Sequence, residues 1–384
     1  MFSQRSAHDA RKNAIAQLLE RVRPEFDLSE SNPTRTELPY AFEEVLRAFD
    51  NAALRRYEPD PHGLSSAREA VAAHMRARGF AIGPEQITLA SGTSEAYGYL
   101  FKLLCDPGDE VLVPEPSYPL FGDLCRLEHV RTRSYPLHYD GRWHIGLAEL
   151  RAAIGERTRA ILLVTPNNPT GSYLKRSELA ELETLGLPLI SDEVFADYPL
   201  RDDPERTLSA LESTRALAFS LGGLSKQVGL PQWKVSWLVA KGPADQIIQA
   251  RERLELIADT YLSVATPTQL ALPRLLEIGA PVRRAIHARL RRNHAALARA
   301  ITDDSAVSLL DAEGGFYATL RLPRFQSEEA WVLELLERDS VHVQPGFFFD
   351  FPDEAFIVLS LLTPEHTFDE GLKRILARVA AQTP

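Results

Sequence analysis

The sequence has few residues that could cross-link the chain, and it has no long apolar run. Only two cysteines occur in 384 residues, Cys105 and Cys125, and both lie in apolar helical contexts. Buried free thiols are therefore expected rather than a disulfide, and no CxxC or paired-histidine spacing indicates a metal site. The polar residues 1–23 contain no apolar segment, and no run is long enough to cross a bilayer. These absences predict a cytoplasmic protein without a secretion signal or a membrane span.

The chain also lacks an excess of positive charge. It has 43 lysines and arginines against 53 aspartates and glutamates, a formal net charge of -10. A basic footprint for nucleic acid is therefore absent, and we expect no nucleic-acid partner. Composition is ordinary for a globular protein, with 45% hydrophobic and 25% charged residues. The length suffices for two domains.

The order of apolar segments predicts an α/β fold. Short apolar runs alternate with helical patterns and cover residues 87–90, 110–113, 160–165, 187–191, 216–221 and 235–240. Most are apolar throughout, as parallel strands are when helices cover both faces of their sheet. We therefore expect an open, mostly parallel sheet flanked by helices, with ligands at the carboxyl ends of the strands.

The remaining segments predict helices and a smaller α+β unit. Helices are expected over residues 1–23, 39–49 and 64–78, the last capped by Ser65 or Ser66, and two long ones over 245–276 and 281–301. Strands at 315–322 and 355–362 alternate with helices at 327–338 and 368–379. We predict a large domain over residues 46–275, and a small domain formed by residues 1–45 and 276–384.

A lysine lies between two of the apolar strands. The run 216–221 ends at Gly222 and Gly223, Lys226 follows in a short turn, and the next strand begins at residue 235. A lysine held there would lose solvation, which favours its neutral, nucleophilic amine. A surface turn lysine would give the same local pattern.

Three other polar segments follow predicted strands. Ser91, Gly92 and Thr93 open a helix, where free backbone amides and the helix dipole can bind a phosphate, although a plain N-cap would look alike. Asn168 lies in a proline-bounded turn over residues 165–171 and offers an amide donor. Asp192 follows the strand at 187–191, where a buried carboxylate needs a partner such as a cationic ring nitrogen, or serves as a helix cap.

Phosphate cradle, amide, carboxylate and lysine together describe a site for pyridoxal phosphate. The sequence resembles the class I/II aminotransferases, the fold-type-I enzymes typified by aspartate aminotransferase. Nearly the whole chain is covered, and the matching motifs follow in the same order: Tyr57 with Gly63, Ser91-Gly-Thr, Pro116-Ser-Tyr118, Asn167-Asn-Pro-Thr-Gly, Asp192-Glu and Ser225-Lys226.

The resemblance implies a role for each matching residue. Lys226 forms the Schiff base and carries the proton, Asp192 keeps the pyridine nitrogen protonated, and Asn168 bonds the ring oxygen. Tyr118 stacks on the ring and joins Lys226 and Asp192 as a catalytic residue. Tyr57 reaches the phosphate of a neighbouring subunit, which implies a homodimer with shared sites. Further cofactor contacts are implied for the phosphate end: Ser91, Gly92, Thr93, Ser225 and Lys234, the last in place of the usual arginine.

Three departures from the family pattern affect the site. Phe195 replaces a tyrosine that bonds the ring oxygen, so we hypothesise that the imine of Lys226 keeps its proton to higher pH. Gly223 replaces a serine near the phosphate. Val358 occupies the position of the arginine that holds the substrate carboxylate, unless the alignment is shifted, and no arginine lies between Arg338 and Lys373.

Other residues could take the place of the missing arginine. Arg35, beside Asn32 in the N-terminal loop, is the candidate for substrate binding, and the aromatic stretch 347–351 is a candidate lining of the cleft or part of the core. A substrate that is not an ordinary α-amino acid would also explain the loss, because a bidentate arginine–carboxylate pair is a strong anchor.

The resemblance predicts an enzyme that moves an amino group between an amino acid and a 2-oxo acid. A pyridoxal-phosphate-dependent lyase, decarboxylase or racemase on the same fold is the alternative, since fold does not fix function. A non-catalytic, cofactor-sensing transcription regulator is disfavoured, because no helix-turn-helix pattern precedes the first core strand.

Overall fold

The computed structural model describes residues 2–7, 11–353 and 355–382, and a large mixed sheet dominates it. Within these ranges the sheet has eight strands in the order β2-β9-β8-β7-β6-β3-β4-β5. Neighbours from β8 to β4 pair in parallel, and β9 runs antiparallel between β8 and β2. Their bounds are β2 Ile87–Ala90, β3 Glu110–Glu115, β4 Arg131–Tyr139, β5 Trp143–Ile145, β6 Thr158–Val164, β7 Leu189–Asp192, β8 Ala218–Gly223 and β9 Ser236–Lys241.

The six strands predicted in this region are confirmed, with ends shifted by no more than a few residues, and so is the mostly parallel α/β fold. Strands β4 and β5 were not predicted. They lie at the edge of the sheet, and the first residues of β4, from Arg131 to Ser134, are exposed. An edge strand without an apolar run gives no hydrophobic signal in the sequence.

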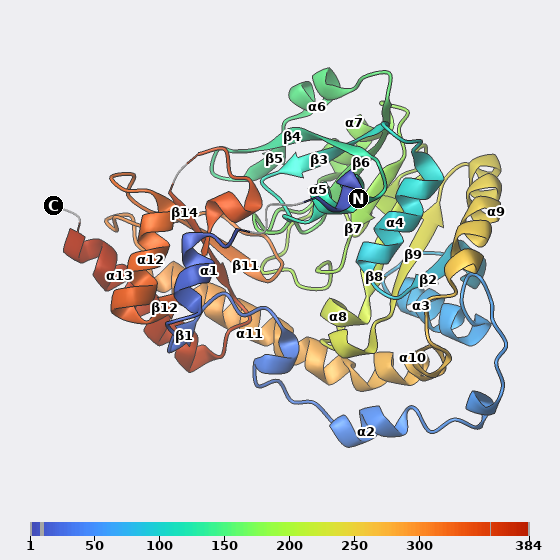
Figure 1. The fold of residues 1–384 in the computed structure, drawn as a ribbon, viewed down its shortest axis with the longest axis horizontal. Helices are drawn as coiled ribbons and strands as arrows, with labels where there is room; N and C mark the ends of the chain where they lie inside the picture. Colours follow the sequence, from blue (N-terminus) through green and yellow to red (C-terminus); the bar gives the residue numbers. More distant parts are fainter. Residues whose placement is uncertain (1, 8–10, 354, 383–384) are drawn as a thin grey trace.

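Helices cover both faces of the sheet, which explains why its central strands are apolar throughout (Figure 1). One face packs against α4 (Thr93–Leu104), α5 (Phe121–Leu127) and α9 (Ala244–Tyr261). The other packs against α3 (Ser65–Ala77), α6 (Leu147–Ala153), α7 (Arg176–Glu183) and α10 (Thr266–Ile278). The short helix α8 (Leu224–Gln227) follows β8 directly.

The prediction of one continuous helix over residues 245–276 was wrong. The helix ends at Tyr261, Leu262 adopts a left-handed conformation with φ of 44°, and α10 begins after Ala265 with Pro267 in its first turn. Pro267 has no backbone N–H to donate to an earlier carbonyl, so it is tolerated in the first turn of α10 but would interrupt one continuous helix. The expected serine cap of α3 was also wrong, because Leu64 is the N-cap and no side chain caps that end.

A second hydrophobic cluster joins the two ends of the chain. It contains α1 (Ala14–Leu19), α11 (Ala280–Ala300), α12 (Glu328–Asp339) and α13 (Glu365–Gln382), around a sheet of order β10-β11-β14-β13. In Figure 1 the blue helix α1 lies beside the orange and red C-terminal elements. The strands are β1 Phe26–Asp27, which pairs with β12 Val341–His342, and β10 Ser308–Leu309, β11 Tyr317–Arg321, β13 Gln344–Pro345 and β14 Phe356–Ser360.

The predicted helix over residues 1–23 was wrong in its length. Among the described residues of this range, only Gln4–Ser6, a 3-10 turn, and α1 are helical. The predicted helix also includes residues 1 and 8–10, which lie outside the described residues. The helix predicted over 39–49 is α2 (Phe42–Arg47). The remaining 3-10 turns are Pro33–Arg35, Ala52–Arg55, Pro84–Gln86, Ala210–Glu212, Pro231–Trp233 and Gly346–Phe349. No helix in the described ranges has the length and apolar character of a membrane span.

Candidate active site

A cavity of about 280 Å³ lies at the carboxyl ends of β6, β7 and β8. Parallel strands end at one edge of their sheet, so the segments that follow them meet there. The cavity joins residues from the polar segments singled out in the sequence with residues of the N-terminal segment and of β11. Its lining consists of Ser31, Thr93, Tyr118, Val164, Asn168, Asp192, Val194, Phe195, Gly223, Ser225, Lys226, Ser236 and Tyr317.

The amine of Lys226 lies in apolar surroundings. Its Nζ is 5.8 Å from the ring centre of Phe195 and 5.7 Å from that of Phe316. The one hydrogen bond described for the amine goes to the carbonyl oxygen of Ser31, at 3.4 Å. Burial lowers the pKa of Lys226 to about 8, while the charges of Glu30 and Asp192 act in the opposite direction. A substantial fraction of the amine is therefore neutral near pH 8, as a nucleophile requires.

Asp192 ends β7 as a buried carboxylate with two donors. The hydroxyl of Tyr97 donates to Oδ2 at 2.9 Å, and the backbone N–H of Val194 donates to Oδ1 at 3.1 Å. Burial raises the pKa of Asp192 to about 6, and both hydrogen bonds oppose that rise. A cationic partner in the cavity would stabilise the ionised form.

The two asparagines in the proline-bounded turn after β6 differ in their hydrogen bonds. Asn167 is committed to the protein, since its amide donates to the carbonyl of Pro116 at 3.0 Å and accepts from Ser117 at 2.8 Å. Asn168 is different. It is buried and lines the cavity, and its side-chain oxygen has no hydrogen-bond partner among the described residues. This buried oxygen is available to accept a hydrogen bond from a ligand.

Gly92, the N-cap of α4, lies close to Lys234, where the sequence predicts the phosphate contacts. A side-chain carbon on Gly92 would lie 3.2 Å from Nζ of Lys234, so glycine lets the amine come close to the helix N-terminus. Thr93 and Ser225 line the cavity. Ser91 is held elsewhere, because its hydroxyl donates to the carbonyl of Ser263 at 2.8 Å and its backbone N–H to Glu95 at 2.7 Å.

Several predicted residues do not line the cavity. Arg35 is exposed and its guanidinium lies 3.5 Å from Glu30, while the side chain of Asn32 accepts from the backbone N–H of Thr34. Tyr57 is 71% exposed in this single chain. Of the stretch 347–351, Phe349 and Phe351 pack in the hydrophobic core, and no residue of that stretch lines the cavity.

Other residues of the site escaped the sequence analysis. Tyr97 lies four residues after Thr93 on α4, and that helical spacing was a usable signal. Tyr198 donates to the carbonyl of Lys226 at 2.7 Å and so holds the turn that carries the lysine. Tyr317 and Ser31 come from distant segments, and nothing in the sequence places them at the cavity.

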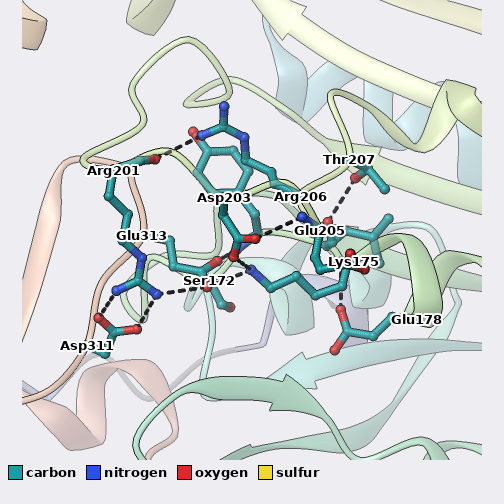
Figure 2. A network of polar contacts seen from close by, with 12 residues as sticks. Ser172, Lys175, Glu178, Arg201, Asp203, Glu205, Arg206, Thr207, Asp311 and Glu313 are labelled. Atoms are coloured by element: carbon teal, nitrogen blue, oxygen red, sulfur yellow. Dashed lines mark hydrogen bonds and ion pairs between the residues drawn. The ribbon is translucent and has the colours of Figure 1, made fainter.

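An ion network holds the segment before Tyr317 against the large sheet's loops (Figure 2). At its centre, the buried carboxylate of Glu313 lies 2.6 Å from Nζ of Lys175 and 3.3 Å from Arg201. Lys175 also binds Asp203 at 2.8 Å, and Arg201 binds Asp311. The network therefore joins segments that follow the cavity residues of β6 and β7 to the segment that leads into β11.

Gly171, at the end of the proline-bounded turn, lies against the segment that leads into β11. Its φ is 75°, and its carbonyl accepts the backbone N–H groups of Glu313 and Gly314. A side-chain carbon here would lie 2.7 Å from the carbonyl oxygen of Gly314, which is closer than such contacts allow. Glycine is required by both the backbone and the packing.

A buried lysine that faces a buried carboxylate, an amide and a helix N-terminus defines an enzyme site that can hold a phosphorylated pyridine aldehyde. The family model described as aminotransferase class I and II matches residues 23–375. The chain belongs to this family and is an aminotransferase, and the enzymes of this family use pyridoxal phosphate. Among the described residues, no cluster of histidine, cysteine, aspartate or glutamate could hold a metal ion.

Named relatives support the same class. The glutamate-pyruvate aminotransferase AlaA of Escherichia coli (strain K12) is 30% identical over 304 residues, which cover 76% of this chain and 75% of the relative. The tyrosine aminotransferase of Bos taurus is 26% identical over 357 residues, 89% of this chain and 78% of the relative. The fold matches that of an alanine aminotransferase from Pyrococcus furiosus, with a TM-score of 0.86, 22% identity and complete coverage of both chains.

Proposed function

We propose that this enzyme moves an amino group between an amino acid and a 2-oxo acid, with pyridoxal phosphate bound in the cavity beside Lys226. The observation that carries the proposal is the pairing of two buried, oppositely tuned groups in one cavity, an amine with a lowered pKa and a carboxylate with a raised one. Groups perturbed in this way are typical of catalytic sites.

The residues present fit the cofactor. When bound, pyridoxal phosphate supplies a carbonyl carbon for the amine and a ring that withdraws electrons from the substrate. Asp192 would accept a hydrogen bond from the ring nitrogen, and the side-chain N–H of Asn168 would donate to the ring oxygen. The N-terminus of α4, with Thr93 and Lys234, would hold the phosphate.

Lys226 has two tasks in this proposal. As a neutral amine it attaches the cofactor, and once a substrate amine has displaced it, Nζ is free to take and return a proton. The phenyl rings of Phe195 and Phe316 keep water from this amine. Tyr118, half-buried at the cavity wall, would cover one face of the ring.

We also propose a homodimer with shared sites, and a division into a large domain (residues 46–275) and a small domain (residues 1–45 and 276–384). The exposure of Tyr57 suits a residue that reaches a neighbouring subunit, and the separate cluster at the chain ends suits a small domain. A cytoplasmic location remains a prediction from the sequence.

A single-turnover experiment tests the function. The yellow holoenzyme is mixed with amino acids but no oxo acid, and the cofactor spectrum is followed. Conversion to pyridoxamine phosphate supports transamination, while consumption of substrate without that conversion would support the lyase, decarboxylase or racemase alternative. Lys226→Ala should abolish conversion, and Lys241→Ala, outside the cavity, should not.

A further inference from the structure

Apart from Lys226, the described residues of this chain that line the cavity offer no positive charge to an anionic substrate. Among the described residues that line it, Lys226 is the only cation and Asp192 the only carboxylate. Both are already assigned to the cofactor in the proposed function, on which this inference rests. The lining residues that remain for the substrate are apolar, aromatic or neutral and polar. They are Val164, Val194, Phe195, Tyr317 and Ser31.

The nearest further charges do not attract a carboxylate. Glu30, next to Ser31, acts electrostatically on Lys226 and on Tyr317, and its own charge is negative. Arg35 is 74% exposed and its guanidinium lies beside Glu30, so it does not reach the cavity lining. Lys234 lies against Gly92 at the phosphate end.

The face of β11 and β14 that carries Tyr317 has neutral side chains as well, although Tyr317 is the one among them that lines the cavity. Tyr317 pairs with Ser360 and Thr319 with Val358, so these four side chains lie on the face that carries Tyr317 into the cavity. Val358 is fully buried. The hydroxyl oxygen of Thr319, directly opposite it, has no hydrogen-bond partner among the described residues.

A carboxylate that enters such a cavity loses its hydration without gaining an ion pair. A buried guanidinium would favour the ligand that carries the carboxylate by about tenfold to a hundredfold. Without it, apolar contacts decide which donor binds.

We propose that this site selects its amino donor by an apolar or aromatic side chain and not by the carboxylate, so that it accepts a primary amine about as well as the amino acid with the same side chain.

Matched donor pairs test this selection in single turnovers of the holoenzyme. Tyramine is compared with tyrosine, and 2-phenylethylamine with phenylalanine, by the second-order rate constant for conversion of the cofactor. We expect each pair to agree within about threefold, or to favour the amine, because the difference in binding is small. A preference for the amino acid of more than about threefold would overturn the proposal.

A binding measurement separates this inference from the proposed function. Calorimetry on the holoenzyme compares 3-phenylpropanamide with 3-phenylpropionate, which have the same carbon skeleton and differ in that a neutral amide replaces the charged carboxylate. We expect the neutral amide to bind at least as tightly, whether or not any donor is converted. Tighter binding of the carboxylate would contradict the selection proposed here, whereas failure of all donors with the expected binding order would contradict only the aminotransferase reaction.

Val358→Arg adds the missing charge beside the free hydroxyl of Thr319. It should raise the ratio of amino-acid to amine rate constants by about tenfold or more. Val358→Met is the control of similar bulk without charge, and it should leave the ratio unchanged. An equal ratio in Val358→Arg and in the control would contradict the placement of Val358 near the substrate. If Val358→Arg does not fold, the comparison of the amide and the carboxylate on the natural chain still tests the proposal.

Discussion

The hydroxyl of Tyr97 donates a hydrogen bond of 2.9 Å to Oδ2 of Asp192, although the two residues lie on different elements, α4 and β7. Tyr97 is almost completely buried, and its own pKa is raised by burial and by the charge of Asp192. The bond therefore keeps its proton on the tyrosine and directs it to the carboxylate. In this way α4 contributes to both ends of the site, through its N-terminus and through Tyr97.

Tyr97→Phe should raise the pKa of Asp192 further. A hydrogen bond to a charged group contributes about 1.5–3 kcal/mol, which corresponds to a rise of about one to two pKa units from the present value of about 6. The acidic limb of the pH profile for binding of pyridoxal phosphate to the cofactor-free protein should therefore move to higher pH. Tyr99→Phe is the matched control, because its hydroxyl contacts Ser263 and not Asp192. Equal profiles for both variants would refute the role of Tyr97.

Lys226→Met should stabilise the cofactor-free protein in a pH-dependent way. Burial lowers the pKa of Lys226 from its ordinary 10.5 to about 8. Below pH 8 the folded protein must bury a charged amine, which lowers the free energy of unfolding. Between pH 8 and 10.5 the unfolded chain binds more protons than the folded one, so the free energy of unfolding rises with pH until the cost of burying the charge is gone. We expect a gain of about 1–3 kcal/mol at pH 7, measured by denaturant unfolding. The gain should shrink above pH 8, and a pH-independent gain would show that only packing changed.

Tyr57→Phe should weaken cofactor binding if Tyr57 reaches the phosphate of a second subunit. Loss of one hydrogen bond to a charged group predicts about a tenfold to hundredfold rise in the dissociation constant. Tyr261→Phe, another exposed tyrosine, is the control. Sedimentation should show a dimer for the natural chain, and a monomer that binds the cofactor with unchanged affinity would disprove the shared site.

Glu313→Gln should loosen the segment that leads to Tyr317. The substitution leaves Lys175 and Arg201 without their common, buried partner, which predicts a loss of about 1–3 kcal/mol in the free energy of unfolding. Hydrogen exchange of residues 311–317 should increase as well. Glu205→Gln, at an exposed position of the same network region, should change neither quantity by much.

The sequence was informative where buried strands lead into polar turns. Asp192, Asn168 and Lys226 follow such strands, and the structure brings all three to one cavity. Apolar runs and turn residues are local signals, so they can be read without knowledge of the fold. The same reasoning failed for β4, whose exposed side chains carry no such signal.

Residues that reach the site from distant segments could not be predicted. Ser31 and Tyr317 lie 195 and 91 positions from Lys226, and only packing of the chain ends against the large sheet brings them close. The helix break at Leu262 is different, because Pro267 was a signal in the sequence that the prediction of one helix over residues 245–276 did not use. Arg35 was proposed from its position in the loop alone, and its side chain turns instead to Glu30.

The contact between Gly171 and Gly314 has a consequence for how this chain can evolve. A side chain at Gly171 would meet the Gly314 carbonyl, and one at Gly314 would meet the ring of Tyr173 at 2.5 Å. Neither position can accept a side chain, although the two are 143 residues apart in the sequence. Descendants of this protein should therefore keep glycine at both positions, because each added side-chain carbon would also meet a backbone oxygen, that of Gly314 or that of Tyr198, which no substitution removes.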